Sequence, residues 1–176
     1  LADNTIFIFT TDNGTSTGAN VHNSGMRGRK GSEYDGGHRV PFFMHWPKGG
    51  LTEGRNVDMI TSYVDIVPTL IDYCQVPAPK GVKFDGVNIR PLIEGKAKNW
   101  KDRILVTDSQ RVRDPIKWRK SAVMTDQWRL VNGKELYDIN TDPGQKQDVA
   151  RSHPGVVSRL TKFYDAWWNE IVPTFG

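Results

Sequence analysis

Two neighbouring oxygen-bearing side chains follow the first apolar segment of the sequence. Asp12 and Asn13 come directly after residues 5–10, whose β-branched and aromatic side chains predict a strand. In open α/β sheets, ligands bind in the crevice at the carboxyl ends of strands. Carboxylate and amide oxygens suit a hard cation such as Ca²⁺ or Mg²⁺, although two ligands do not complete such a site. An Asx-type turn that closes the strand accounts for the same two residues.

A basic, glycine-rich segment comes next, at residues 26–32. Its glycines allow the backbone to approach a ligand closely, and Arg29 and Lys30 are suited to neutralise an oxyanion. The spacing is not that of a Walker A phosphate loop. A solvated basic loop is the alternative interpretation. In the same region, His22 and His38 are typical of ordinary loop histidines.

These residues need a sheet to position them, and the sequence offers few strands for it. Residues 5–10 have the continuous apolar pattern of a strand buried on both faces, which is typical of parallel sheets. Residues 42–46 predict a second strand and residues 104–106 a third. Residues 11–41 between them predict a long loop. We therefore expect the chain to be the C-terminal part of a larger α/β protein.

The second half of the sequence has an antiparallel pattern. Three short strand-like runs at 121–124, 128–131 and 135–138 are separated by turn signals, among them Asn132-Gly133. Apolar residues at helical spacing predict a C-terminal helix over 154–171, in which Trp167 and Trp168 pack against the small sheet. An earlier helix is expected at 65–74, with Asp65 as its cap and Pro68 in its first turn.

The composition excludes several classes of protein. The chain has 176 residues, 37% of them hydrophobic, a formal net charge of +4 and one cysteine. It is too apolar to be disordered, and a single cysteine permits no internal disulfide. No apolar run approaches the roughly 20 residues that span a bilayer, so membrane insertion is not expected. Residues 96–134 hold eleven lysines and arginines against four acids, a pattern that favours polyanion binding or a solvated face. No nucleic-acid motif accompanies the charge, and nucleic acid is not an expected partner.

The order of the motifs resembles that of one family. The segments at 8–14, 27–32, 35–41, 62–70 and 135–143 together resemble the C-terminal half of the sulfatase family, which belongs to the alkaline-phosphatase-like superfamily. The resemblance implies an α/β fold: the C-terminal part of an alkaline-phosphatase-like sheet, plus a small antiparallel sheet subdomain packed by a C-terminal helix. It divides the chain into residues 1–100, part of the catalytic domain, and a small C-terminal subdomain, residues 101–176.

The resemblance also assigns roles to individual residues. It places Asp12 and Asn13 as ligands of a divalent cation, commonly Ca²⁺, with Mg²⁺ as the alternative. It makes Lys30 the catalytic residue that contacts the sulfate and the ester oxygen. Arg29 and His38 depart from the family pattern and are assigned to substrate binding, while Asp35 and Arg39 are expected to hold the Lys30 loop.

The family nucleophile is absent from the sequence. Sulfatases use a formylglycine made from Cys or Ser in a Cys/Ser-x-Pro-x-Arg motif. Cys74 does not match that motif and is expected to be a small buried residue at a helix end. The resemblance therefore implies a sulfuric ester hydrolase whose formylglycine lies on a missing N-terminal part, and an inactive isolated fragment. A phosphodiesterase or phosphonate hydrolase of the same superfamily and a non-catalytic polyanion-binding module are the alternatives.

The expected partners follow from the same reasoning. They are the missing N-terminal part and a sulfated small molecule or sulfated saccharide. Four basic residues on an expected inter-strand loop would steer a saccharide: Arg111, Arg113, Lys117 and Arg119. A periplasmic or secreted bacterial protein is expected rather than a lysosomal one.

Overall fold

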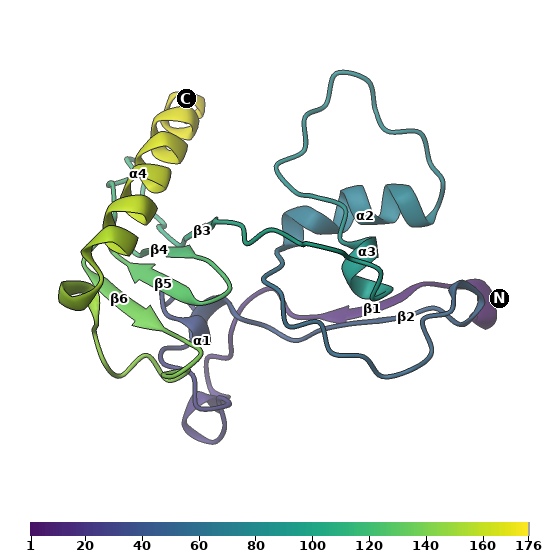
Figure 1. Ribbon diagram of the computed structural model, residues 1–176, viewed down its shortest axis with the longest axis horizontal. Coiled ribbons are helices and arrows are strands. Elements are labelled where there is room, and N and C mark those ends of the chain that lie inside the picture. Colours follow the sequence, from purple (N-terminus) through teal and green to yellow (C-terminus); the bar gives the residue numbers. More distant parts are fainter. Residues whose placement is uncertain (176) are drawn as a thin grey trace. The chain divides into compact units, whose positions relative to one another are not determined.

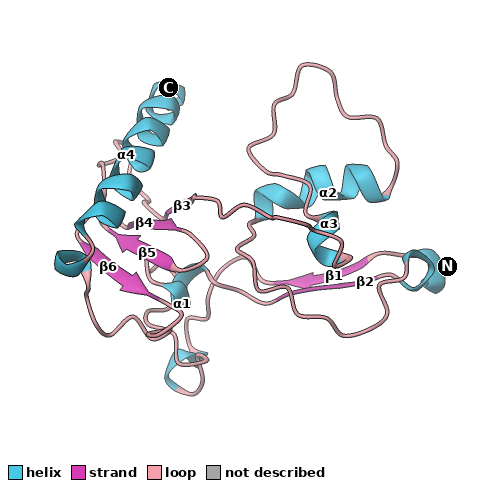
Figure 2. Cartoon of the chain, viewed as in Figure 1, coloured by secondary structure: helices cyan, strands magenta, loops and turns pink. Residues whose placement is uncertain are grey.

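The computed structural model describes residues 1–175, and the chain folds into two compact units. The first unit comprises residues 1–7 and 44–103, and the second comprises residues 8–43 together with the chain from Ile104 onward. Figures 1 and 2 show the helices and strands of both. The expected boundary between two domains at residue 100 stays a prediction. None of the helices in residues 1–175 is long and apolar enough to cross a membrane.

The first two strands form a small sheet of their own. Strand β1 spans Phe7–Thr10 and pairs with β2, Phe42–His45, as the sequence predicts. Phe7, Phe9 and Phe43 are exposed, with relative accessibilities of 56%, 61% and 64%. The expected burial of the first strand on both faces is therefore not found in these residues. The physical reason is that nothing in residues 1–175 covers the phenylalanine side chains of this two-stranded sheet.

The first unit contains the helices α2, Ile66–Tyr73, and α3, Arg90–Ile93. Pro68 lies in the first turn of α2, where the missing N–H group costs no hydrogen bond. Asp65 does not cap that helix with its side chain. Instead its buried carboxylate accepts hydrogen bonds from the Arg103 guanidinium at 2.7 and 2.8 Å. Cys74 follows α2 but is exposed, so the expectation of a buried thiol was wrong.

The second unit is organised around a four-stranded antiparallel sheet. Its strands are β3, Leu105–Asp108; β4, Ser121–Met124; β5, Trp128–Val131; and β6, Glu135–Asp138, in the order β3-β4-β5-β6. The Asn132-Gly133 turn between β5 and β6 has positive φ at both residues, 50° and 68°, as a tight hairpin requires. The strand expected at 104–106 belongs to this sheet, where it pairs with β4.

The period of two along each strand gives this sheet two different faces. One face buries Val123, Leu130 and Leu136 against helix α4, Pro154–Ile171, which contributes Leu160 and Tyr164 to the same core. Trp167 and Trp168 pack against that core, as predicted. The opposite face carries Ala122, Val131 and Tyr137, against which Tyr34 packs. The segment that contains the candidate site therefore lies on the face opposite α4 (Figure 1).

Candidate functional site

The long loop over residues 11–41 is folded back on itself by backbone hydrogen bonds. The Gly14 N–H donates to the Gly37 carbonyl at 3.0 Å, and the Lys30 N–H donates to the Thr15 carbonyl at 2.9 Å. Gly36 lies in the short helix α1, Asp35–His38, and its N–H donates to the Arg27 carbonyl at 2.8 Å. These bonds join the three segments that the sequence singled out, and they hold the backbone of Lys30 against Thr15, two residues after Asn13.

Glycine is needed where these segments touch. A Cβ atom on Gly14 would collide with the carbonyl oxygen of Gly36, and a Cβ atom on Gly37 would collide with the carbonyl oxygen of Ser32. Gly28 has φ of +82°, a left-handed conformation that favours glycine. The glycine-rich composition of this loop therefore serves the close packing of backbone on backbone.

The side chains of Asp12 and Asn13 lie together at the end of β1. The Asn13 amide donates a hydrogen bond to Asp12 Oδ2, and Asp12 is exposed. The carboxylate and amide oxygens are hard donors of the kind that Ca²⁺ and Mg²⁺ bind. Within residues 1–175, however, no cluster of three or more His, Cys, Asp or Glu side chains is arranged to hold a metal ion. The pair therefore fits part of a cation site and needs further ligands to complete it.

Arg29 and Lys30 present two free cations on the same loop as this pair. Both side chains are exposed, and neither forms an ion pair with another described residue. The backbone of their turn is fixed, because Ser32 N donates to Arg29 O at 2.8 Å. An anion that approaches this loop meets guanidinium and ammonium groups that no carboxylate of the described chain already neutralises.

His38 lies in a different environment from these exposed cations. Its ring is largely buried, with Nε2 placed 3.2 Å from the Glu33 carbonyl oxygen and 4.0 Å from Asp35 Oδ1. Burial lowers the pKa of His38, which the nearby Asp35 carboxylate opposes and the Arg129 guanidinium reinforces. The imidazole contacts the interior of the loop, and its assignment to substrate binding stays a prediction.

A buried ion pair anchors α1 to the sheet. Asp35 is fully buried, and its Oδ1 accepts a hydrogen bond of 2.9 Å from Nε of Arg129 on β5. Gln145, also fully buried, accepts a hydrogen bond from the Asp35 N–H through Oε1 at 2.8 Å. Arg39 is only a distant partner, since its Nη1 lies 3.7 Å from Asp35 Oδ2 on an exposed side chain. Asp35 thus has the structural role expected of it, with Arg129 as its main partner.

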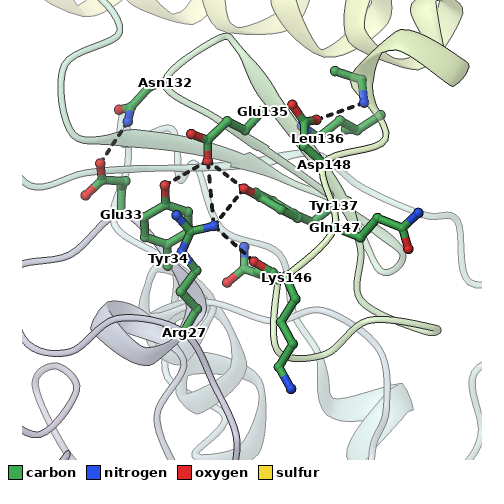
Figure 3. A network of polar contacts seen from close by, with 12 residues as sticks. Arg27, Glu33, Tyr34, Asn132, Glu135, Leu136, Tyr137, Lys146, Gln147 and Asp148 are labelled. Carbon is green, nitrogen blue, oxygen red and sulfur yellow. Dashed lines mark hydrogen bonds and ion pairs between the residues drawn. The ribbon is translucent and has the colours of Figure 1, made fainter.

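A second cluster ties Arg27 to the same face of the sheet (Figure 3). Arg27 Nη1 donates to the Tyr137 hydroxyl at 2.8 Å and to the Gln145 carbonyl at 3.0 Å. The hydroxyls of Tyr34 and Tyr137 both donate to Glu135 Oε2, at 2.7 and 2.6 Å. Burial and the Glu135 carboxylate raise the pKa of Tyr34 to about 12. The guanidinium also lies over the Tyr34 ring, 3.8 Å from its centroid.

Sequence reasoning missed the residues that anchor the loop. The anchoring residues are separated from their partners in the loop by 94 to 118 positions in the sequence. They are Arg129, Tyr137, Glu135 and Gln145. One local signal was available, because Arg129 interrupts the apolar strand run at 128–131 at a position that faces the loop. A charged residue at a buried strand position indicates a charged partner from another element.

Comparisons with known proteins point to one family. The Sulfatase family model matches residues 1–76. An arylsulfatase of Clostridium perfringens is 33% identical over 85% of this chain and 30% of its own, and an N-acetylgalactosamine-6-O-sulfatase of Bacteroides thetaiotaomicron is 27% identical over 94% of this chain and 37% of its own. The crystal structure of Ps i-CgsB in complex with k-i-k-neocarrahexaose matches 94% of this chain and 37% of that chain, with a TM-score of 0.80 and 27% identity. The chain thus spans about a third of the length of these relatives.

Proposed function

Because the chain belongs to the sulfatase family, we propose that its 11–41 loop forms one side of the active site of a sulfuric ester hydrolase. The observation that carries the proposal is the hydrogen bond between Lys30 N and the carbonyl oxygen of Thr15, two residues after Asn13. A cationic side chain and a pair of oxygen ligands are held on one loop, with their charges not neutralised by other described residues.

Lys30 is the proposed catalytic residue. A transferring sulfuryl group carries negative charge on its oxygens, and the ester oxygen gains negative charge as its bond to sulfur breaks. A fixed cation stabilises that charge where it develops. The ammonium group of Lys30 is exposed and without an ion-pair partner in the described chain, so it is available to such an oxygen. Arg29, one residue earlier, and His38, on α1, are proposed to contact other parts of the substrate.

Asp12 and Asn13 are proposed to hold a divalent cation, Ca²⁺ rather than Mg²⁺. Ca²⁺ takes six to eight oxygen ligands in flexible geometry, which suits a site assembled from separate segments. When bound, such a cation acts as a Lewis acid that polarises the oxygens of the ester. The two residues supply a minority of the ligands, and the remaining ones are proposed to come from parts of a sulfatase that this sequence does not contain.

The nucleophile is proposed to lie outside this sequence as well. No Cys or Ser in the 176 residues begins a Cys/Ser-x-Pro-x-Arg motif. We therefore propose that a formylglycine in another part of the protein attacks the sulfur, and that residues 1–176 alone are inactive.

The proposed substrate class is a sulfated saccharide. One relative is named as an N-acetylgalactosamine-6-O-sulfatase, and the solved Ps i-CgsB was crystallised with k-i-k-neocarrahexaose. The matched relatives just described are bacterial where their source is named. A periplasmic or secreted location is proposed for this protein rather than a lysosomal one.

The decisive experiment replaces Lys30 in the complete reading frame that encodes this chain. With 4-nitrophenyl sulfate as substrate, Lys30→Ala is expected to lower kcat by about 10²–10³, the loss typical of one donor to a developing oxyanion. Lys48→Ala is the matched control, because Lys48 is equally exposed and lies outside the loop. Wild-type turnover by Lys30→Ala would overturn the assignment. Faster hydrolysis of 4-nitrophenyl phosphate than of the sulfate would move the reaction to phosphoryl transfer.

A further inference from the structure

We propose that the loop between β3 and β4, residues 109–120, is a binding surface for a sulfated polysaccharide chain. The proposal rests on the function proposed above and makes the substrate a polymer. A monosaccharide bound at the 11–41 loop would not contact residues 109–120, which pack against α4. The two regions lie on opposite faces of the same sheet, so one occupant of both must be long.

The charge of the chain is concentrated in this loop. It contains five basic residues and one acid, Asp114, and its excess of four positive charges equals the formal net charge of the whole chain. The rest of the sequence therefore contains as many acids as bases. A local excess of this size attracts a linear polyanion, whose counterions are released on binding. The five basic residues are Arg111, Arg113, Lys117, Arg119 and Lys120.

The loop is held in one conformation by specific contacts. The Gln110 side chain bridges its two arms: Oε1 accepts from the Ile116 N–H at 2.8 Å, and Nε2 donates to the Ile116 carbonyl at 2.9 Å. The Trp118 ring stacks on Tyr164 of α4 with centroids 3.7 Å apart, and the Trp118 N–H donates to the Tyr164 hydroxyl at 3.1 Å. The loop is thus preorganised, so binding an anion through it orders few further side chains.

The arginines of this loop are exposed and available. Arg111, Arg113 and Arg119 form no ion pair with another described residue. Lys117 differs from them, since its Nζ lies 2.8 Å from Asp165 Oδ1 on α4, which fixes that arm of the loop. A guanidinium binds two oxygens of a sulfate or carboxylate through two parallel N–H groups, whereas the ammonium of lysine acts as a point charge. Three free arginines on a fixed loop suit repeated sulfate groups.

Two other polyanions fit the loop less well. Single-stranded nucleic acid needs exposed aromatic rings on which its bases stack, and Trp118 is already stacked on Tyr164. A surface that binds an anionic membrane is typically rich in Trp, Phe and Leu, whereas the exposed apolar residues of this loop are Val112 and Ile116 alone. A saccharide chain requires neither feature.

The test is a binding measurement on the complete protein with dextran sulfate, and with neutral dextran of the same length as the unsulfated probe. The variant Arg111→Ser/Arg113→Ser/Arg119→Ser is compared with a control that removes the same charge elsewhere in the second unit, Arg151→Ser/Arg159→Ser/Lys162→Ser. We expect the first variant to bind dextran sulfate at least tenfold more weakly. The salt dependence of its affinity is expected to show about two or three fewer counterions released on binding. The control variant is expected to change the affinity less than threefold. Neutral dextran is expected not to bind.

A second variant tests the preorganisation without changing the charge. Gln110→Ala removes both bridges to Ile116 and is expected to weaken binding several-fold, with circular dichroism unchanged. Turnover of 4-nitrophenyl sulfate is measured in parallel, and retained turnover with weakened polymer binding supports the proposal. Equal losses in the two triple variants, or tighter binding of single-stranded DNA or phosphatidylserine vesicles than of dextran sulfate, overturn it. Absence of turnover in every variant would count against the proposed reaction and leave the binding result intact.

Discussion

Arg129 Nε lies 2.9 Å from Oδ1 of Asp35, and this buried contact joins β5 to the loop that carries the candidate site. The two residues are 94 positions apart in the sequence. Arg129 is 6% exposed and Asp35 fully buried, so both charges have left water and depend on each other. The guanidinium also donates to the Thr125 and Trp128 carbonyls through Nη1, so three of its five N–H groups have acceptors in the described chain. The position of α1, and with it the Lys30 turn, thus depends on a residue of the antiparallel sheet.

Replacing Arg129 by Met is expected to destabilise the protein strongly. The variant leaves the Asp35 carboxylate buried without its main partner, which typically costs about 3–5 kcal/mol. Urea denaturation monitored by tryptophan fluorescence measures the loss. Arg39→Met is the control: Arg39 is exposed and lies 3.7 Å from the same carboxylate, so its removal is expected to cost less than about 1 kcal/mol. Equal losses in the two variants would contradict the dominant role of Arg129.

The local elements of this fold were predictable from the sequence. Helix α4 and strands β4, β5 and β6 lie where apolar periodicity and turn residues placed them, because each is defined by a pattern over neighbouring residues. The Asn132-Gly133 hairpin follows from the backbone preference of two adjacent residues. The strand β3 lies close to the run expected at 104–106, but its antiparallel pairing with β4 was not predicted, since a short apolar run does not specify its pairing partner.

The contacts between distant segments were not predictable in the same way. The motif order places Asp12, Asn13 and Lys30 in one region, and their joint role in a site stays a prediction. The anchoring of that region by Arg129 and Gln145 depends on which face of β5 and which turn meet α1. The local sequence indicates that Arg129 has a charged partner but does not identify Asp35, because the two residues are brought together only by tertiary packing. Cys74 shows the same limit, since a helix end is local but its burial depends on what covers it.

Gly14→Ala is expected to disrupt the 11–41 loop. The added methyl group would occupy the position of the Gly36 carbonyl oxygen, and because backbone surrounds it on the Gly36–Gly37 side, no flexible side chain can give way. We expect a loss of several kcal/mol in the free energy of unfolding, in the range of a severe overpacking substitution. Gly54→Ala is the matched control, because a Cβ atom there meets no atom within 4 Å. Thermal unfolding of both variants tests this, and a Gly14→Ala protein as stable as Gly54→Ala would refute the packing.

His38 is expected to make stability depend on pH on the acid side of neutrality. Burial lowers its pKa in the folded state below the ordinary value of about 6.5, so between these two values the unfolded chain binds a proton that the folded chain does not. Stability therefore falls as the pH falls through this window and is fully present above it. His38→Gln is expected to flatten this part of the curve of unfolding free energy against pH, whereas the exposed control His22→Gln leaves it unchanged. A curve that keeps its full slope in His38→Gln would show that another group is responsible.

Asp12 is expected to determine whether Ca²⁺ stabilises the complete protein. A cation that binds only the folded state raises the free energy of unfolding by RT ln(1 + [Ca²⁺]/Kd), about 2.7 kcal/mol at a hundredfold excess over Kd. Asp12→Ala removes one of the two hard oxygen donors at the end of β1, and because Asp12 is exposed its loss alone is expected to cost about 0.5 kcal/mol or less. The measurement is the shift in Tm between EDTA and saturating Ca²⁺, which is expected to be present in the wild type and lost in Asp12→Ala. The control Asp58→Ala removes an exposed carboxylate of the first unit and is expected to retain the shift. The readout is independent of turnover, so it separates the metal assignment from that of Lys30. A Ca²⁺-dependent shift of wild-type size in Asp12→Ala would remove Asp12 from the metal site.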